Sequence, residues 1–128
     1  MDKKVKYWIE LAEYDLETAQ VMLETGRLLY VGFMCHQVIE KAIKGYFTQV
    51  IGDMPPRTHN LEYVAEKCAL LGKMDDTQRR FMQKLMPLNV ESRYPSDREE
   101  IAQTLSKSIC AEMISGTREL IEWIKKQL

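Results

Sequence analysis

Residues 35–44 read Cys-His-Gln-Val-Ile-Glu-Lys-Ala-Ile-Lys, and this stretch decides the fold. It lies within an apolar run over residues 28–51 that contains no proline. At the period of an α-helix, His36, Glu40 and Lys44 fall on one stripe, and apolar side chains occupy most of the remaining circumference. A helix that is apolar around most of its surface is normally buried at the centre of a domain. The pattern therefore predicts a buried central helix whose polar stripe is paired, hydrated or functional.

The length and composition are those of one soluble helical domain. The chain has 128 residues, which is enough to close a single core, and it is 45% hydrophobic and 29% charged, which excludes disorder. Its net charge of −1 argues against bulk electrostatic attraction to nucleic acid or to an anionic membrane. The 18 basic residues still leave room for a local basic patch.

The cysteines and the start of the chain indicate a cellular compartment. The three cysteines are widely spaced and form no C-x-x-C pair, so we expect free thiols in a reducing environment. Polar and charged residues interrupt the run over residues 28–51, which excludes it as a membrane span. The first residues lead directly into an amphipathic pattern without a signal-peptide core. We therefore expect a cytoplasmic protein with no membrane segment.

Apolar periodicity predicts helices throughout the chain and no strand. Proline and glycine separate them at Gly26, at residues 52–57, at Gly72 and at Pro87. The expected fold is an all-α, up-and-down bundle of four long helices plus one short helix in a single domain over residues 1–128. The expected helices cover about residues 4–25, 29–51, 61–71, 75–86 and 97–126.

The last of these helices should be unusually long. Ser96 and Glu99 form a capping box that opens it, and its apolar face is wide. Gly116 lies within that face and indicates either a close helix contact or a slight kink. Two explanations for the wide face stay open: a partner covers it, in a homodimer or hetero-complex, or a kink at Gly116 folds the tail back on the bundle.

Few residues have the types and spacings that catalysis or metal binding needs. Asp15 lies close to the apolar face of the first helix, so we expect a neighbouring helix to offer it a hydrogen bond or a salt bridge. His36 and Glu40 could reach one metal with Asp15, but the chain contains no Glu-x-x-His motif, so no metal or other cofactor is expected. Cys35 and His36 are adjacent in a helix and point about 100° apart, which excludes a nucleophile–base dyad.

Arg93, Tyr94 and Pro95 form the one extended segment of note. An arginine followed by an aromatic residue in a loop suits the clamping of a phosphate or the stacking of a base. In the other interpretation Tyr94 packs on the bundle and Arg93 pairs with an acidic neighbour. Both interpretations are consistent with the sequence.

Four motifs together resemble the HEPN domains (higher eukaryote and prokaryote nucleotide-binding). They are Ala12-x-x-Asp15-Leu16-x-x-Ala19, His36-Gln37-x-x-Glu40-Lys41-Ala42-x-Lys44, Thr58-His59-x-Leu61 and Arg93-Tyr94-Pro95. The resemblance implies a helical bundle that commonly dimerises and that is often paired with a separate minimal nucleotidyltransferase, in many cases as a toxin–antitoxin module. Many HEPN domains are also metal-independent ribonucleases, in which an arginine precedes a histidine by five to seven positions.

This chain departs from the ribonuclease pattern. No arginine stands five to seven positions before His36 or His59, and the positions five to seven after Arg93 hold Arg98, Glu99 and Glu100. The histidine that would act as acid or base is therefore missing. The leading hypothesis is a non-catalytic module that binds a nucleotide or RNA and docks a nucleotidyltransferase. The alternatives are a divergent ribonuclease toxin and a purely structural interaction protein.

No catalytic residue is assigned, and the hypothesis places the ligand-binding site on six residues. Those residues are Asp15, Glu40, Lys41, Lys44, Arg93 and Tyr94. His59 is expected at the edge of this polar site.

Overall fold

The computed structural model describes residues 1–128, apart from the side chain of Ser92. The all-α fold is confirmed, and no strand occurs among the described residues. The α-helices are α1 (Lys3–Glu24), α2 (Leu28–Ile51), α3 (Leu61–Lys67), α4 (Asp76–Leu85), α5 (Pro95–Gln103) and α6 (Lys107–Gln127). Three 3₁₀ turns lie between them: η1 (Leu71–Lys73), η2 (Met86–Leu88) and η3 (Val90–Ser92).

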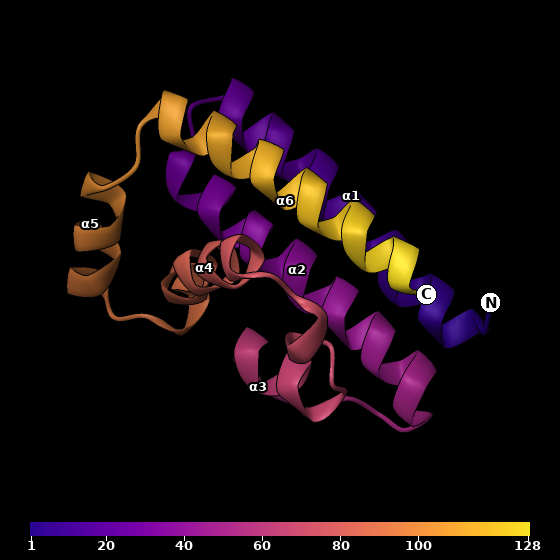
Figure 1. Cartoon of the computed structure of the whole chain (residues 1–128). Coiled ribbons are helices and arrows are strands. Elements are labelled where there is room, and N and C mark those ends of the chain that lie inside the picture. The colour runs from indigo at the N-terminus through magenta and orange to yellow at the C-terminus, as the bar shows by residue number, and fades with distance from the viewer.

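Three long helices, α1, α2 and α6, form the body of the molecule (Figure 1). The α1–α2 pair is an antiparallel hairpin, whereas α6 runs in the same direction as α2. Two contacts show this direction: Cys110 Sγ lies 3.8 Å from Leu28 O at one end, and Gln49 Nε2 donates to Leu128 O at 2.9 Å at the other. Residues 52–106 carry the chain back to the beginning of α2, where α6 starts.

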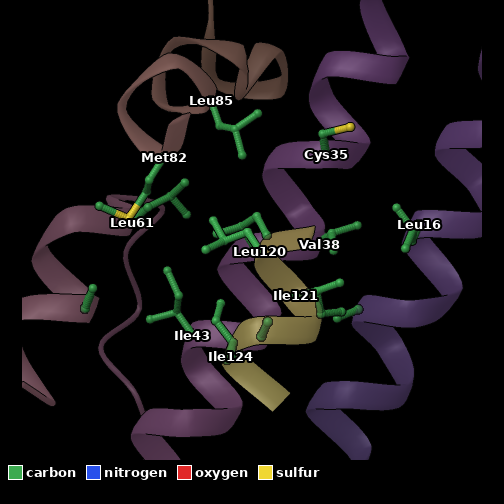
Figure 2. Packing of buried hydrophobic residues seen from close by; sticks show 14 of the residues in the cluster. Leu16, Cys35, Val38, Ile43, Leu61, Met82, Leu85, Leu120, Ile121 and Ile124 are labelled. Atoms are coloured by element: carbon green, nitrogen blue, oxygen red, sulfur yellow. The ribbon is translucent and has the colours of Figure 1, made fainter. Parts of the chain in front are cut away.

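The core forms around α2, as the apolar run predicts. Side chains from every turn of its central part are buried, and Figure 2 shows Cys35, Val38 and Ile43 facing residues of α1, α4 and α6. From α6, Leu120, Ile121 and Ile124 enter the same cluster. The central helix prediction is therefore confirmed.

The prediction of one helix over residues 97–126 is wrong, because the chain turns between α5 and α6. Thr104 ends α5 by donating its hydroxyl to Ile101 O at 2.7 Å. Ser106 then caps α6 by accepting from Ile109 N at 3.1 Å. As a result the structure has three long and three shorter α-helices, not four long helices and one short one.

Gly116 is a point of close approach. A Cβ at this position would lie 2.6 Å from Phe81 Cε1 of α4, so a larger residue here would have to displace the Phe81 ring. α6 continues through Gly116 to Gln127, and the change of direction that folds the C-terminal helix onto the bundle occurs at residues 104–106. Of the two expectations for this glycine, the close contact is confirmed.

None of the helices in the described part of the chain is both long enough and apolar enough to cross a bilayer.

Candidate functional site

The carboxylate of Glu40 holds the polar stripe of α2 together. Lys44, one turn further along α2, donates from Nζ to Glu40 Oε2 at 3.1 Å. His59, in the loop before α3, places Nδ1 2.9 Å from Glu40 Oε1. His36 lies one turn earlier, with Nδ1 3.8 Å from the same oxygen. The Glu40 side chain is only 7% exposed and that of His59 is 62% exposed, so the network ties a surface loop to a buried carboxylate of α2.

Asp15 and Lys41 form an ion pair that joins α1 to α2. The Asp15 side chain is 10% exposed and that of Lys41 is 22% exposed, so the pair is largely shielded from water. The expectation that a neighbouring helix supplies a partner for Asp15 is confirmed. Because each charge neutralises the other, their first role is to hold the α1–α2 hairpin.

His36 is fully buried, and neither of its ring nitrogens makes a hydrogen bond of good geometry among the described residues. Burial lowers its pKa from the ordinary value, and the nearby Glu40 carboxylate and the backbone of His59 oppose this effect only in part. Burial also raises the pKa of the neighbouring Cys35 thiol to about 11. A neutral imidazole and a protonated thiol, both sealed from solvent, do not provide a catalytic pair.

Arg93 and Tyr94 lie between η3 and α5, in the extended conformation that the sequence predicts. Tyr94 is 78% exposed, which contradicts the interpretation that it packs on the bundle. Arg93 is exposed as well, and it has no salt bridge in the part of the chain that the structure describes. Nearby, Arg98 Nε donates to Val90 O at 2.9 Å and holds the turn in shape.

The six predicted site residues form three groups and not one constellation. Asp15 pairs with Lys41, Glu40 pairs with Lys44, and Arg93 and Tyr94 lie apart beside α5. The segment that leads to Arg93 packs near the beginning of α2, where Leu88 Cδ1 lies 3.2 Å from the position that a Cβ would take on Gly32. Lys44 lies twelve residues further along α2, which is about 18 Å at the rise of an α-helix.

No group of three metal-ligating side chains comes together among the described residues. The oxygens of Glu40 are engaged by Lys44 and His59, and the nearest additional imidazole, that of His36, is 3.8 Å away.

The comparisons with known proteins agree with this architecture. The family model of the HEPN domain matches residues 5–127, almost the whole chain. The chain belongs to the HEPN family. The crystal structure of TT1696 from Thermus thermophilus superposes on it with a TM-score of 0.83 at 17% identity, over 99% of this chain and 100% of that one. ST0689, an archaeal HEPN homologue, matches with a TM-score of 0.65 at 23% identity, over 98% of both chains. At these identities the likeness shows a shared fold, and no curated protein matches the chain.

Within this HEPN domain the two histidines and Arg93 come from different elements and have different surroundings. His36 is enclosed by the core, and His59 is bonded to Glu40 near the middle of α2. The residues that follow Arg93 form the first turns of α5, where Arg98 serves a backbone carbonyl. The arginine–histidine spacing of the metal-independent ribonucleases is absent from the sequence around Arg93.

A pocket that the sequence reasoning missed lies where α1 begins and α2 ends. Its volume is about 660 Å³, and it is lined by Lys3, Lys4, Tyr7, Trp8, Thr48, Gly52, Asp53, Met54 and Pro55. The available signal was Gly52 after a long helix, because a glycine C-cap turns the chain back toward the preceding helix. The two walls are far apart in sequence, so periodicity alone does not bring them together.

Proposed function

We propose that this HEPN domain is a non-catalytic module that binds a nucleotide or RNA and docks a separate minimal nucleotidyltransferase, in the manner of a toxin–antitoxin pair. The observation that carries the proposal is the pair Arg93 and Tyr94. The two residues are consecutive, extended, exposed and close to the start of α5. A guanidinium binds phosphate in a bidentate manner and an exposed tyrosine ring stacks on a base, so the pair suits a nucleotide or a single RNA strand.

Two observations favour binding over cleavage. His36 is buried, and burial keeps its imidazole neutral because its pKa is lowered. The other histidine, His59, is engaged with Glu40 and belongs to a different element from Arg93. A bound RNA strand at Arg93 would therefore lack a general acid or base, and the divergent ribonuclease is the second candidate.

The ligand-binding role of Asp15, Glu40, Lys41 and Lys44 stays a prediction. Each of these charges has a partner inside the protein, which favours a positioning role for the group. They would act by holding α1, α2 and the loop at His59 in one arrangement.

Dimerisation and the nucleotidyltransferase partner are likewise proposals. Family membership supports them, because HEPN domains commonly act as dimers beside such an enzyme. Light scattering on the purified chain, alone and mixed with a minimal nucleotidyltransferase from the same genome, tests both. A chain that stays monomeric would contradict dimerisation. A chain that forms no complex with this enzyme would contradict docking.

Binding of fluorescein-labelled single-stranded RNA and of AMP to the purified protein tests the ligand half. We expect Arg93→Ala to weaken RNA binding about tenfold, because one charge-assisted contact is lost. Tyr94→Ala should have a similar effect through the loss of stacking. Arg80→Ala removes the same charge from an exposed position of α4 and serves as the control.

Three outcomes separate the hypotheses. Weaker binding in both site variants, with no RNA cleavage, supports the proposal. RNA cleavage in the presence of EDTA that is lost in Arg93→Ala overturns it in favour of a ribonuclease. No binding to RNA or AMP, with or without the nucleotidyltransferase, favours a purely structural interaction protein.

A further inference from the structure

We infer that the pocket between the start of α1 and the end of α2 binds a planar aromatic ring that carries an anionic group. This site lies at the opposite end of the molecule from α5, near the N- and C-termini in Figure 1. It shares no residue with the site at Arg93 and Tyr94, and it does not depend on that site for its shape.

The turn after α2 builds one wall of the pocket. Gly52 caps α2 in the left-handed conformation, with φ of +81°, and its amide donates to Thr48 O at 3.0 Å. This conformation favours glycine and reverses the direction of the chain. Pro55 is then buried and anchors the segment, whereas Met54 is left 72% exposed at the pocket. Met54 and Pro55 therefore give this wall an apolar part, and the glycine cap and the buried proline hold it in place.

The first turns of α1 supply two aromatic walls. Trp8 is packed into the hairpin: its Cβ lies 3.2 Å from the position that a Cβ would take on Gly45, and Lys44 Nζ lies 6.0 Å from its ring centroid. Tyr7 precedes Trp8 in α1, and its side chain is 61% exposed. Both residues line the pocket, so their rings offer aromatic surface to a ligand ring.

The charge at the rim selects an anion. Lys3 and Lys4 line the pocket, and neither has a salt-bridge partner among the described residues. Asp53 contributes one negative charge, which leaves a formal excess of one positive charge. Asp2 already accepts from Lys4 N at 2.7 Å, so the helix terminus is occupied and the ammonium groups are what remains for a ligand.

The size of the pocket fits one small molecule. About 660 Å³ lies within the range of roughly 300–1,000 Å³ that is typical of small-ligand sites. Apolar and aromatic walls with a few charges at the rim are also the usual composition of such sites. A nucleoside monophosphate and an aryl carboxylate are two sources of the same chemistry, and the experiment separates them.

The two tryptophans provide the test, because Trp8 lines the pocket and Trp123 lies on α6. In a ¹⁵N-labelled protein each indole gives one N–H signal, and Trp123→Phe assigns them. AMP, adenosine, inorganic phosphate and 2-naphthoate are then titrated. We expect AMP, 2-naphthoate or both to shift the Trp8 signal. Adenosine should bind with an affinity at least about tenfold lower, and phosphate alone should cause no shift. Movement with one anion only identifies the source.

Three variants check that the pocket is the binding site. The double variant Lys3→Gln/Lys4→Gln should weaken the anionic ligands about tenfold and leave adenosine unchanged. Tyr7→Ala should weaken all ring-containing ligands. The double variant Lys84→Gln/Lys107→Gln removes the same charge on α4 and at the start of α6, and should change nothing. All these side chains are exposed, so circular dichroism should report an unchanged fold.

Ligand binding in this pocket is tested independently of RNA binding at Arg93 and Tyr94. The inference is overturned if neither anionic ring compound shifts the Trp8 signal. It is also overturned if the lysine and Tyr7 variants bind these compounds as tightly as the unmodified protein does. Arg93→Ala should leave the Trp8 response intact. If that variant abolished it, the pocket assignment would be wrong and the Arg93 site would account for the binding.

Discussion

Glu40 is the residue through which α2 positions the loop before α3. Its two oxygens contact Lys44 within the helix and His59 in the loop, while the buried His36 ring lies just beyond hydrogen-bond distance. Asp15 and Lys41 perform the corresponding role between α1 and α2. These polar side chains thus fix how α1, α2 and the loop before α3 are positioned, because hydrogen bonds and ion pairs are more directional than apolar contacts.

Lys41→Met leaves the shielded Asp15 carboxylate without its partner. The pair is neither fully buried nor exposed, so we expect the free energy of unfolding to fall by about 2 kcal/mol, between the costs typical of surface and buried pairs. Asp15→Leu/Lys41→Met should recover most of the loss, because no lone charge remains. Urea denaturation of the single and double variants measures this coupling, and additive losses would contradict it. Lys6→Met, in the exposed Lys6–Glu10 pair, is the control and should have little effect.

His36 should make the protein less stable in mild acid. Burial lowers its pKa in the folded state, so below about pH 6.5 the unfolded chain binds a proton that the folded protein resists. The stabilisation is complete above the unfolded pKa and is lost as the pH falls toward the folded pKa, with a slope of at most about 1.4 kcal/mol per pH unit. Urea denaturation at pH 7.5 and pH 5 measures it.

His36→Leu should remove this slope, and at pH 7.5 it should change stability by no more than about 1 kcal/mol, since the buried ring nitrogens have no partner to lose. His59→Gln is the control and should retain the His36 contribution. An unchanged slope in His36→Leu would show that another group is responsible.

The helices differ in how they meet their neighbours. α6 runs parallel to α2 because Ser106 starts it near the beginning of α2, and its apolar side chains complete the core between α1 and α2. α4 contacts α6 through Phe81, which fits against the bare backbone of Gly116. Shape at one glycine therefore decides how closely α4 approaches α6.

Gly116→Ala should destabilise the protein by about 1 kcal/mol. Alanine gains about 1 kcal/mol of helix propensity, but its Cβ would meet Phe81 Cε1 at 2.6 Å, and overpacking costs roughly 1–3 kcal/mol. In a Phe81→Ala background the clash is absent, so the same substitution should stabilise by about 1 kcal/mol. Thermal and urea unfolding of the four proteins measure this change of sign, and the same effect in both backgrounds would contradict it.

As a whole, the molecule buries its thiols in one continuous core. Cys35, Cys68 and Cys110 come from three different helical segments and are all buried. Burial also raises the pKa of each thiol, that of Cys35 to about 11. The rate at which a reagent modifies these thiols therefore measures how often the fold opens.

The native protein should react very slowly with an aromatic disulfide reagent at pH 8. At that pH only roughly a thousandth of a thiol with a pKa near 11 is thiolate, and burial adds a steric barrier. In urea above the unfolding midpoint all three thiols should react within minutes. The absorbance of the released thiolate counts them, and Cys35→Ala should lower the count in urea by one. Rapid reaction of a native thiol would show local opening near that cysteine.

Much of the fold follows from sequence patterns. The apolar run around residues 35–44 is sufficient to predict a buried α2, and the position of Asp15 is sufficient to predict its pairing with a neighbouring helix. The helix expected over residues 75–86 is confirmed as α4, which a capping box of Asp75 and Gln78 opens. The break between α5 and α6 was missed, although Ser106 is a competent N-cap, because the apolar periodicity continues through it.

The sequence by itself determined the all-α fold class, the central place of α2 and membership of the HEPN family, because these depend on periodicity and on motifs within single elements. Only the tertiary structure decided which charges pair, that Arg93 and Tyr94 remain exposed, and that Tyr7 and Trp8 face the turn at Gly52. These features depend on where loops return to the helices. That position is set by contacts between residues far apart in the chain, such as Leu88 with Gly32 and His59 with Glu40.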